Sequence, residues 1–142
     1  MTDDDRDKAT ARRLLDALAA RDRGTVSSCL TDDVVWWVPR SAAQLGLERP
    51  YVGCAAVLDL LCGPKSQYRE GTMVWEFHHV LADGGMVATH STLRALTAGG
   101  APYENHYVQL YRLVDGLVAE GWEHTDTAYA FGRFAEPAGD PG

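Results

Sequence analysis

The chain has 142 residues, of which 46% are hydrophobic and 23% are charged, and its formal net charge at pH 7 is −7. A chain of this size and composition predicts one soluble globular domain that folds without disulfides or a metal, and it excludes the disordered and fibrous classes of protein. The 13 basic residues are scattered along an acidic chain, so we expect no surface that follows nucleic-acid phosphates.

Membrane insertion and disulfide bonding are disfavoured as well. No run reaches the roughly 18 apolar residues of a membrane span, and the first residues, MTDDDRD, are acidic where a secretory signal is basic and then apolar. The three cysteines, Cys29, Cys54 and Cys62, form no CxxC pair and are odd in number, which suits small buried thiols in a reducing compartment. We therefore expect a cytoplasmic protein that binds neither nucleic acid nor a membrane.

The first half of the chain is predicted to be mainly helical. Apolar residues recur at three- and four-residue steps over residues 8–21, which indicates an amphipathic helix, and residues 25–30 form a shorter helical segment. The β-branched and aromatic run VVWWVP predicts a first strand, which Pro39 ends. The stretch RSAAQLGLERPYVG has no period and is expected to be irregular, and residues 54–61 predict a further helix.

The second half is predicted to be a β-meander. Four segments, GTMVWEFHHVLA, GGMVATHSTLRAL, YENHYVQLYRL and GLVAEGWEHTDTAY, resemble strands, and the turn residues DGG, TAGGAP and VDG separate them. Asp126 and Thr127 are expected to end the last strand and to cap the segment after it. Helices before antiparallel strands indicate an α+β domain with helices on one face of a curved sheet. We expect residues 7–134 to form this single domain, and residues 1–6 and 135–142 to be disordered tails.

The second face of the predicted sheet is expected to be covered too. Apolar and aromatic residues occur at both parities in MVWEF and YVQLYRL, whereas a sheet with one solvated face shows a cleaner alternation. One face would pack against the helices and the other against a second copy of the chain. A homodimer is therefore the expected assembly.

The order of these segments resembles a known superfamily. Two helices, LTDDVVWWVP, YVG before a helix, and strands that end in VQLYRLVDGLVAEGWEHTD are similar to the NTF2-like superfamily, and within it to the SnoaL-like and ketosteroid-isomerase-like proteins. The resemblance implies a cystatin-like cone, in which N-terminal helices pack on a curved antiparallel sheet around an apolar pocket. It also implies chemistry without a cofactor, although this fold hosts isomerases, cyclases, epoxide hydrolases and binding domains.

The catalytic patterns of this superfamily are only partly present. The tyrosine and two aspartates of the ketosteroid isomerases correspond to Leu14, Val38 and Gln109, of which only Gln109 can donate a hydrogen bond to an oxyanion. The Arg and Asp that the epoxide hydrolases carry on the strand VATHSTLRAL are missing, and their last acid corresponds to Glu123. The general base of the SnoaL-like polyketide cyclases also corresponds to Glu123, while their histidine partner is replaced by Gln109.

Strand geometry supports a role for Glu123. Alternate residues of a strand share a face, so Gly121, Glu123 and Thr125 lie together. If this face lines the cone, Gly121 leaves room for a ligand, and burial raises the pKa of Glu123 toward the range of a general base at neutral pH. The alternative is that Glu123 lies at an exposed edge or is paired with Arg94 or Arg112.

Residues on the two preceding strands are candidate partners of this base. Asn105, Tyr107 and Gln109 share a face that is expected to point inward, and His90 shares a face with Thr92 on the strand before. If that face also points inward, His90 can replace the missing histidine. The candidate catalytic residues are Glu123, His90, Gln109 and Tyr107. The candidate ligand-binding residues are Leu14, Trp36, Val38, Tyr51, Phe77, Thr92, Asn105, Gly121 and Thr125.

No metal site is expected, because His78 and His79 are adjacent on a strand and should point to opposite faces. The sequence therefore favours a cofactor-independent acid–base enzyme that isomerises or cyclises a small hydrophobic molecule of polyketide-, terpenoid- or steroid-like type. Two alternatives stay open. One is an epoxide hydrolase or epoxide-opening cyclase on the same fold, and the other is a domain that binds a small molecule without transforming it.

Overall fold

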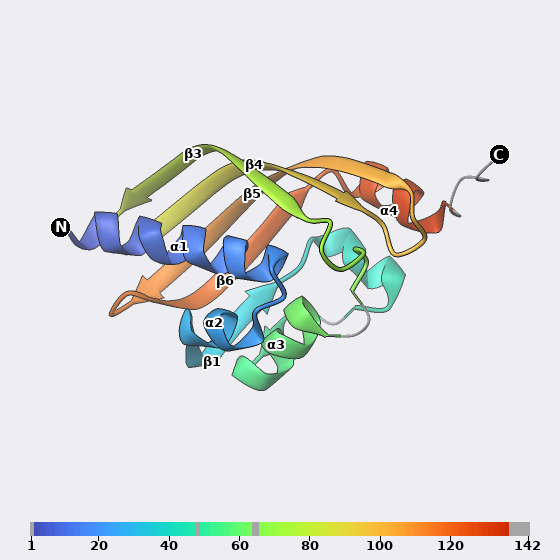
Figure 1. Ribbon diagram of the computed structural model, residues 1–142. Coiled ribbons are helices and arrows are strands. Elements are labelled where there is room, and N and C mark those ends of the chain that lie inside the picture. The colour runs from blue at the N-terminus through green and yellow to red at the C-terminus, as the bar shows by residue number, and fades with distance from the viewer. Residues whose placement is uncertain (1, 48, 64–65, 137–142) are drawn as a thin grey trace.

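A computed structural model of the protein describes residues 2–47, 49–63 and 66–136, which form one α+β unit (Figure 1). The helical elements are α1 (Asp3–Ala19), α2 (Arg23–Ser28), the 3-10 helix η1 (Arg40–Leu45), α3 (Cys54–Cys62) and α4 (Thr127–Ala135). The strands are β1 (Leu30–Trp37), β2 (Tyr51–Val52), β3 (Val74–Asp83), β4 (Met86–Leu96), β5 (Pro102–Val114) and β6 (Leu117–Thr125). The predicted four-strand meander and its hairpins are confirmed.

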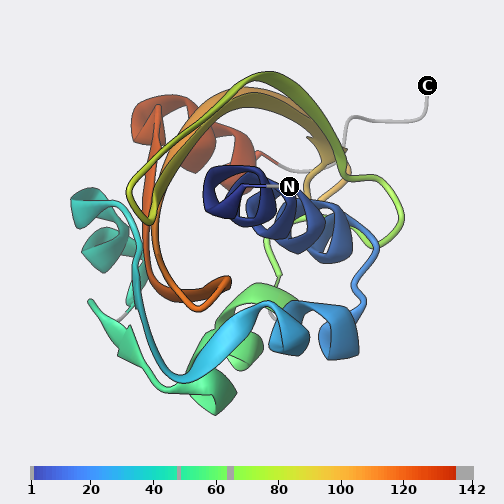
Figure 2. The ribbon, with the colours of Figure 1, turned by 90° about the vertical axis from the view of Figure 1, so that its left-hand side faces the viewer.

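The six strands form one curved sheet in the order β2-β1-β6-β5-β4-β3. In Figure 2 the sheet curves around α1, which lies on its concave side. The strands β3 to β6 are antiparallel as expected, but β1 pairs with β6 in parallel. The sheet is therefore mixed. β1 follows α1 and α2 near the start of the chain, yet its neighbour in the sheet is the last strand, β6, and no hairpin connects these two strands. In this register Trp36 lies opposite Gly121 and Trp37 opposite Trp122.

Helix α1 begins earlier than the apolar period indicates. Thr2 accepts a hydrogen bond from the backbone N–H of Asp5, whose carboxylate accepts from the N–H of Thr2, and this capping box fixes the first turn. Asp3 and Asp4 lie in the same turn, where their negative charges interact favourably with the positive end of the helix dipole. The prediction that residues 1–6 form a loose tail is thus wrong for residues 3–6. Of the tail expected over residues 135–142, Ala135 belongs to α4, and residues 137–142 lie outside the described residues.

Helix α4 covers the end of the concave face that α1 does not reach (Figure 1). Asp126 is its N-cap and accepts a hydrogen bond from the N–H of Tyr129 at 3.1 Å, which confirms the predicted cap. Ala130 of this helix is buried against a second apolar cluster that contains Leu93, Tyr103 and Tyr107. The sequence predicts the cap but not the helix, which is only nine residues long.

The convex face of the sheet is open in the single chain. Val74 and Leu81 on this face are 60% and 64% exposed, and Val108 and Val114 are 44% and 46% exposed. These apolar side chains are interspersed with charged residues such as Arg94 and Glu104 on the same face, and the expected homodimer stays a prediction. None of the described helices is both long enough and apolar enough to span a membrane.

A bulge in β3 changes the expected orientation of two histidines. The pairing of β3 with β4 shifts between Phe77 and His79, so His78 and His79 both lie on the exposed convex face. The prediction that they point to opposite faces is wrong, because strict alternation holds only for a regular strand. Within residues 2–47, 49–63 and 66–136, no three His, Cys, Asp or Glu side chains are gathered in a way that could hold a metal ion.

Replacement of Gly121 should destabilise the fold. A Cβ at this position would lie 2.7 Å from Cε3 and Cζ3 of Trp36, so Gly121→Ala must displace the buried indole. We expect the free energy of unfolding, measured with urea, to fall by about 1–3 kcal/mol. The matched control is Gly132→Ala in α4, where a Cβ meets nothing within 4 Å, and this variant should be at least as stable as the parent. Equal stability of Gly121→Ala and the parent would contradict the packing.

Candidate active site

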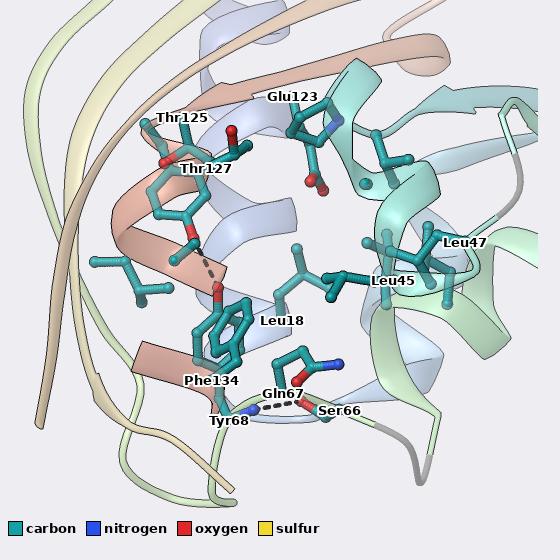
Figure 3. A pocket seen from close by; sticks show the side chains of 18 of the residues that line it. Leu18, Leu45, Leu47, Ser66, Gln67, Tyr68, Glu123, Thr125, Thr127 and Phe134 are labelled. Atoms are coloured by element: carbon teal, nitrogen blue, oxygen red, sulfur yellow. Dashed lines mark hydrogen bonds between the residues drawn. The ribbon is translucent and has the colours of Figure 1, made fainter. Parts of the chain in front are cut away.

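A cavity of about 190 Å³ lies between the concave face of the sheet and the helices. Its wall is mostly apolar, and α1, η1, α3, α4 and four strands contribute to it (Figure 3). The apolar lining residues include Leu18, Val38, Leu45, Leu47, Leu60, Leu61, Met73, Trp75, Leu93, Phe131 and Phe134. The polar lining residues include Glu123, Gln109, Tyr107, Tyr68, Thr125 and Thr127. A few polar groups in an apolar hollow are typical of a small-molecule site.

Glu123 of β6 points its carboxylate into this cavity (Figure 3). Its Oε1 accepts a hydrogen bond from the indole Nε1 of Trp36 at 2.9 Å. Burial raises the pKa of Glu123 from its ordinary 4.5 to about 7, although the Trp36 hydrogen bond acts in the opposite direction. The carboxylate therefore exchanges a proton near neutral pH.

The alternative environment for Glu123, a salt bridge with an arginine, does not occur with either of the two expected partners. Arg94 contacts Glu76 and Glu104, at 2.6 and 2.7 Å, and Arg112 lies 3.4 Å from Glu120. Both arginines lie on the convex face of the sheet, whereas Glu123 points to the concave one. Strand alternation therefore separates them.

Gln109 of β5 lies beside Glu123 across the sheet, since the two residues are register partners. It is 3% exposed and lines the cavity. The hydroxyl of Thr89 donates to its Oε1 at 3.0 Å. Its amide N–H group donates to no other described residue and can serve a ligand. A buried amide donor next to a carboxylate base can stabilise an oxyanion that forms when the base removes a proton.

Three tyrosine hydroxyls form a chain at the other side of the cavity. The hydroxyl of Tyr107 lies 2.6 Å from that of Tyr68 and 2.6 Å from that of Tyr103. Nδ2 of Asn105 donates to the Tyr103 hydroxyl at 3.0 Å. Tyr68 and Tyr107 line the cavity directly, so Asn105, which was expected to bind ligand, instead supports the tyrosines from behind.

Two of the expected site residues lie on the wrong face. His90 is exposed on the convex side, where its ring stacks on that of His79 at 5.3 Å. Thr92 lies on the same side, between His78 at 2.7 Å and His106 at 3.0 Å. The shared face of His90 and Thr92 was predicted correctly, but its direction was wrong, because the alternate set of β4 residues faces the helices. His90 therefore cannot act in the cavity.

Other expected ligand contacts are part of the core instead. Trp36 and Leu14 are fully buried and lie outside the lining of the cavity, and Trp36 reaches the site only through Glu123. Gly121 leaves room for the Trp36 ring and not for a ligand. Tyr51 and Phe77 pack against the main core and also lie outside the lining.

Val38 and Thr125 do line the cavity, as do the expected Tyr107, Gln109 and Glu123. Sequence reasoning missed Tyr68, Trp75 and the residues of α4. Tyr68 lies in the irregular segment before β3, where no period shows a direction. Trp75 carries a clear strand signal, and its parity, which matches that of other inward residues of β3, could have placed it in the cavity.

This arrangement, a helix-covered curved sheet around an apolar cavity with one half-buried carboxylate, defines the NTF2-like class of fold. A family model, the SnoaL-like domain, matches residues 11–121, and the chain belongs to this family. A search of curated proteins found no relative that matches the sequence.

Solved structures with the same fold have diverse descriptions. An NTF2-like protein of unknown function from Burkholderia pseudomallei K96243 is 21% identical with a TM-score of 0.83, over 96% of this chain and 100% of that one. A proposed SnoaL-like polyketide cyclase from Jannaschia sp. CCS1 is 17% identical with a TM-score of 0.81, over 96% of both chains. An LEH-like epoxide hydrolase from M. tuberculosis is 19% identical with a TM-score of 0.74, over 94% of this chain and 92% of that one. These likenesses establish the fold.

The raised pKa of Glu123 predicts a pH-dependent stability. Because its pKa in the folded protein, about 7, lies above its ordinary 4.5, the folded state holds a proton that the unfolded state has already lost. The stabilisation of the folded state by this proton is fully present below about pH 4.5 and is lost as the pH rises through about 7. Over this range the parent should lose on the order of 2 kcal/mol of unfolding free energy relative to Glu123→Gln. Urea unfolding of both proteins measures it, and a constant difference would show a solvated carboxylate.

Proposed function

We propose that the protein is a cofactor-independent acid–base catalyst that acts on a small apolar carbonyl compound by isomerisation or cyclisation. The observation that carries this proposal is the carboxylate of Glu123, which lies in an apolar cavity with a pKa of about 7. A base is most effective when its pKa is near the working pH, because it is then deprotonated and still able to hold the proton it takes. Membership of the SnoaL-like family is consistent with this chemistry.

The proposed reaction begins with removal of a proton from a carbon next to the carbonyl group. Oε1 of Glu123 stays bound to the Trp36 N–H, so Oε2 takes the proton. The C–H electron pair moves into the carbonyl group, and the developing oxyanion accepts a hydrogen bond from the Gln109 amide. Protonated Glu123 then returns the proton to another carbon, which completes an isomerisation. Attack of the enolate on a second carbonyl carbon, with the proton delivered to the new alkoxide, completes a cyclisation.

Epoxide opening is a second candidate function, and the tyrosines favour it. Hydroxyls of Tyr68 and Tyr107 line the same cavity as Glu123. A tyrosine hydroxyl can donate a proton to an epoxide oxygen while Glu123 removes a proton from an attacking water or from a hydroxyl of the same ligand. The two candidate functions share the base and differ in the electrophile.

Activity should depend on Glu123 and not on its counterpart Glu120. We expect the protein to isomerise 3-cyclohexenone to 2-cyclohexenone and to exchange the α-protons of 1-indanone in D₂O. Glu123→Gln should lower both rates by about 10²–10⁴-fold. Glu120→Gln is the matched control, since Glu120 also accepts from a tryptophan, Trp37 Nε1 at 2.8 Å, but on the convex face. The control should keep its rate within about twofold.

The pH dependence gives an independent reading of the same reaction. Because the base must be deprotonated, kcat/KM should rise about tenfold per pH unit below the pKa of Glu123, about 7, and level off above it. Absence of both ketone reactions would overturn the proposal. Hydration of styrene oxide that requires Glu123 would then establish epoxide opening, and binding of these compounds without turnover would establish a binding domain.

A further inference from the structure

We propose that a groove next to the cavity is a second binding site, in which Arg40 and Arg49 hold an anionic group of the ligand. The ligand class that this predicts is a one-ring or two-ring ketone with a carboxylate on a short chain. The ring would lie in the cavity and the carboxylate in the groove. The inference rests on the proposed function for the place of the ring, but binding alone tests it, so it can fail or succeed separately from catalysis.

The groove lies at the end of β1 and β6, and its lining differs in character from that of the cavity. Residues that line the groove and not the cavity include Trp37, Arg40, Ser41, Arg49, Trp122 and His124. Two guanidinium groups beside two indole rings form a basic and aromatic surface, whereas the cavity wall is mostly aliphatic and aromatic. Such a surface suits an anion that is attached to an apolar body.

The groove and the cavity adjoin. The residues that line both of them are Val38, Pro39, Glu123, Thr125 and Thr127. The pairing of β1 with β6 ends at Trp37 and Trp122, whereas β6 continues to Thr125, so the two strands separate at this point. In Figure 3 Glu123, Thr125 and Thr127 lie along one side of the cavity. A ligand that extends out of the cavity on this side enters the groove.

Arg49 is fixed in the groove before a ligand arrives. Its Nε donates to the carbonyl oxygen of Val38 at 2.8 Å, and its guanidinium carbon lies 5.4 Å from the centre of the Trp37 ring. Neither the carbonyl group nor the ring carries a full negative charge. A guanidinium that is already positioned loses little conformational entropy when it binds a carboxylate, and its planar fork matches the two carboxylate oxygens.

The positive charges of the groove have no ionic partner among the described residues. Elsewhere in the chain arginines are paired, as Arg94 is with Glu76 and Glu104. Neither Arg40 nor Arg49 forms an ion pair with an acid in the part of the chain that the structure describes. In a protein with a formal net charge of −7, two such arginines in one groove favour an anionic ligand group there.

The acids of β6 do not occupy this site. Glu123 is the one acid of the described residues that lines the groove, and its carboxylate points into the cavity (Figure 3). Glu120 lies on the convex face, where it accepts from Trp37 Nε1 at 2.8 Å and lies 3.4 Å from Arg112. An anion in the groove therefore meets two guanidinium groups and no carboxylate directed at it from these residues.

The test uses acids and amides of the same shape. The acids are phenylacetate, 3-phenylpropanoate, 4-phenylbutanoate and 5-phenylpentanoate, and each is compared with its neutral amide by isothermal titration calorimetry at about pH 8, where the acids are ionised. The parent should bind the best acid about tenfold more tightly than its amide. The preference should peak at one chain length, because a ligand that spans both sites must match the distance between them.

The two arginines should each contribute to this preference. In Arg49→Gln and in Arg40→Gln it should fall to within about threefold, while the amides bind as before. Arg69→Gln is the matched control, since it removes the same charge from a residue outside both linings, and it should keep the preference. The side chain of Arg40 forms no hydrogen bond with another described residue, so Arg40→Gln tests the site even if Arg49→Gln, which loses the Val38 and Trp37 contacts, does not fold.

Three outcomes would overturn the proposal. The first is an equal affinity of the parent for acids and amides, and the second is a tenfold preference that persists in both arginine variants. The third is a preference that does not vary with chain length, because the ligand would then lie wholly in the groove. Glu123→Gln should retain the preference for the acid even though it loses turnover, which separates this inference from the catalytic one.

Discussion

The hydrogen bond from the Trp36 indole to the Glu123 carboxylate connects β1, from the first half of the chain, with β6, from the second half, at the wall of the cavity. It depends on the parallel pairing of β1 with β6, which places Trp36 opposite Gly121, and on the missing Cβ of Gly121, which lets the indole lie against β6. The bond leaves one carboxylate oxygen for a ligand and fixes the direction in which it points. The position of the base, and hence any chemistry in the cavity, follows from this packing.

A second tryptophan and glutamate pair on the same two strands shows what the cavity contributes. Trp37 donates to Glu120 just as Trp36 donates to Glu123, at a nearly equal distance of 2.8 Å. Glu120, however, lies on the convex face next to Arg112, whereas Glu123 is enclosed by apolar side chains. The indole donor alone favours the charged form of a carboxylate, so the raised pKa of Glu123 comes from its loss of water and not from its partner.

Much of this fold could be predicted because its strands carry local signals. The four long strands are rich in β-branched and aromatic residues and are separated by glycine-rich turns. The inward direction of Tyr107, Gln109 and Glu123 follows from strand parity once one inward residue on each strand is assumed. The direction of β4 could not be predicted in this way, because both of its faces carry polar residues such as Thr89 and His90. The parallel contact of β1 with β6 and the bulge at His78 were also out of reach, because neither leaves a short-range pattern.

The distance along the chain between Trp36 and Glu123, 87 residues, has a consequence for how the protein folds. Contacts between residues far apart in sequence slow folding, since closing a long loop costs entropy before the contact repays it. The last strand to be synthesised takes a central place in the sheet, between β1 and β5. Until β6 inserts there, β1 has an open edge and the cavity has no carboxylate. A chain interrupted before β6 therefore has neither a complete sheet nor the Glu123 carboxylate.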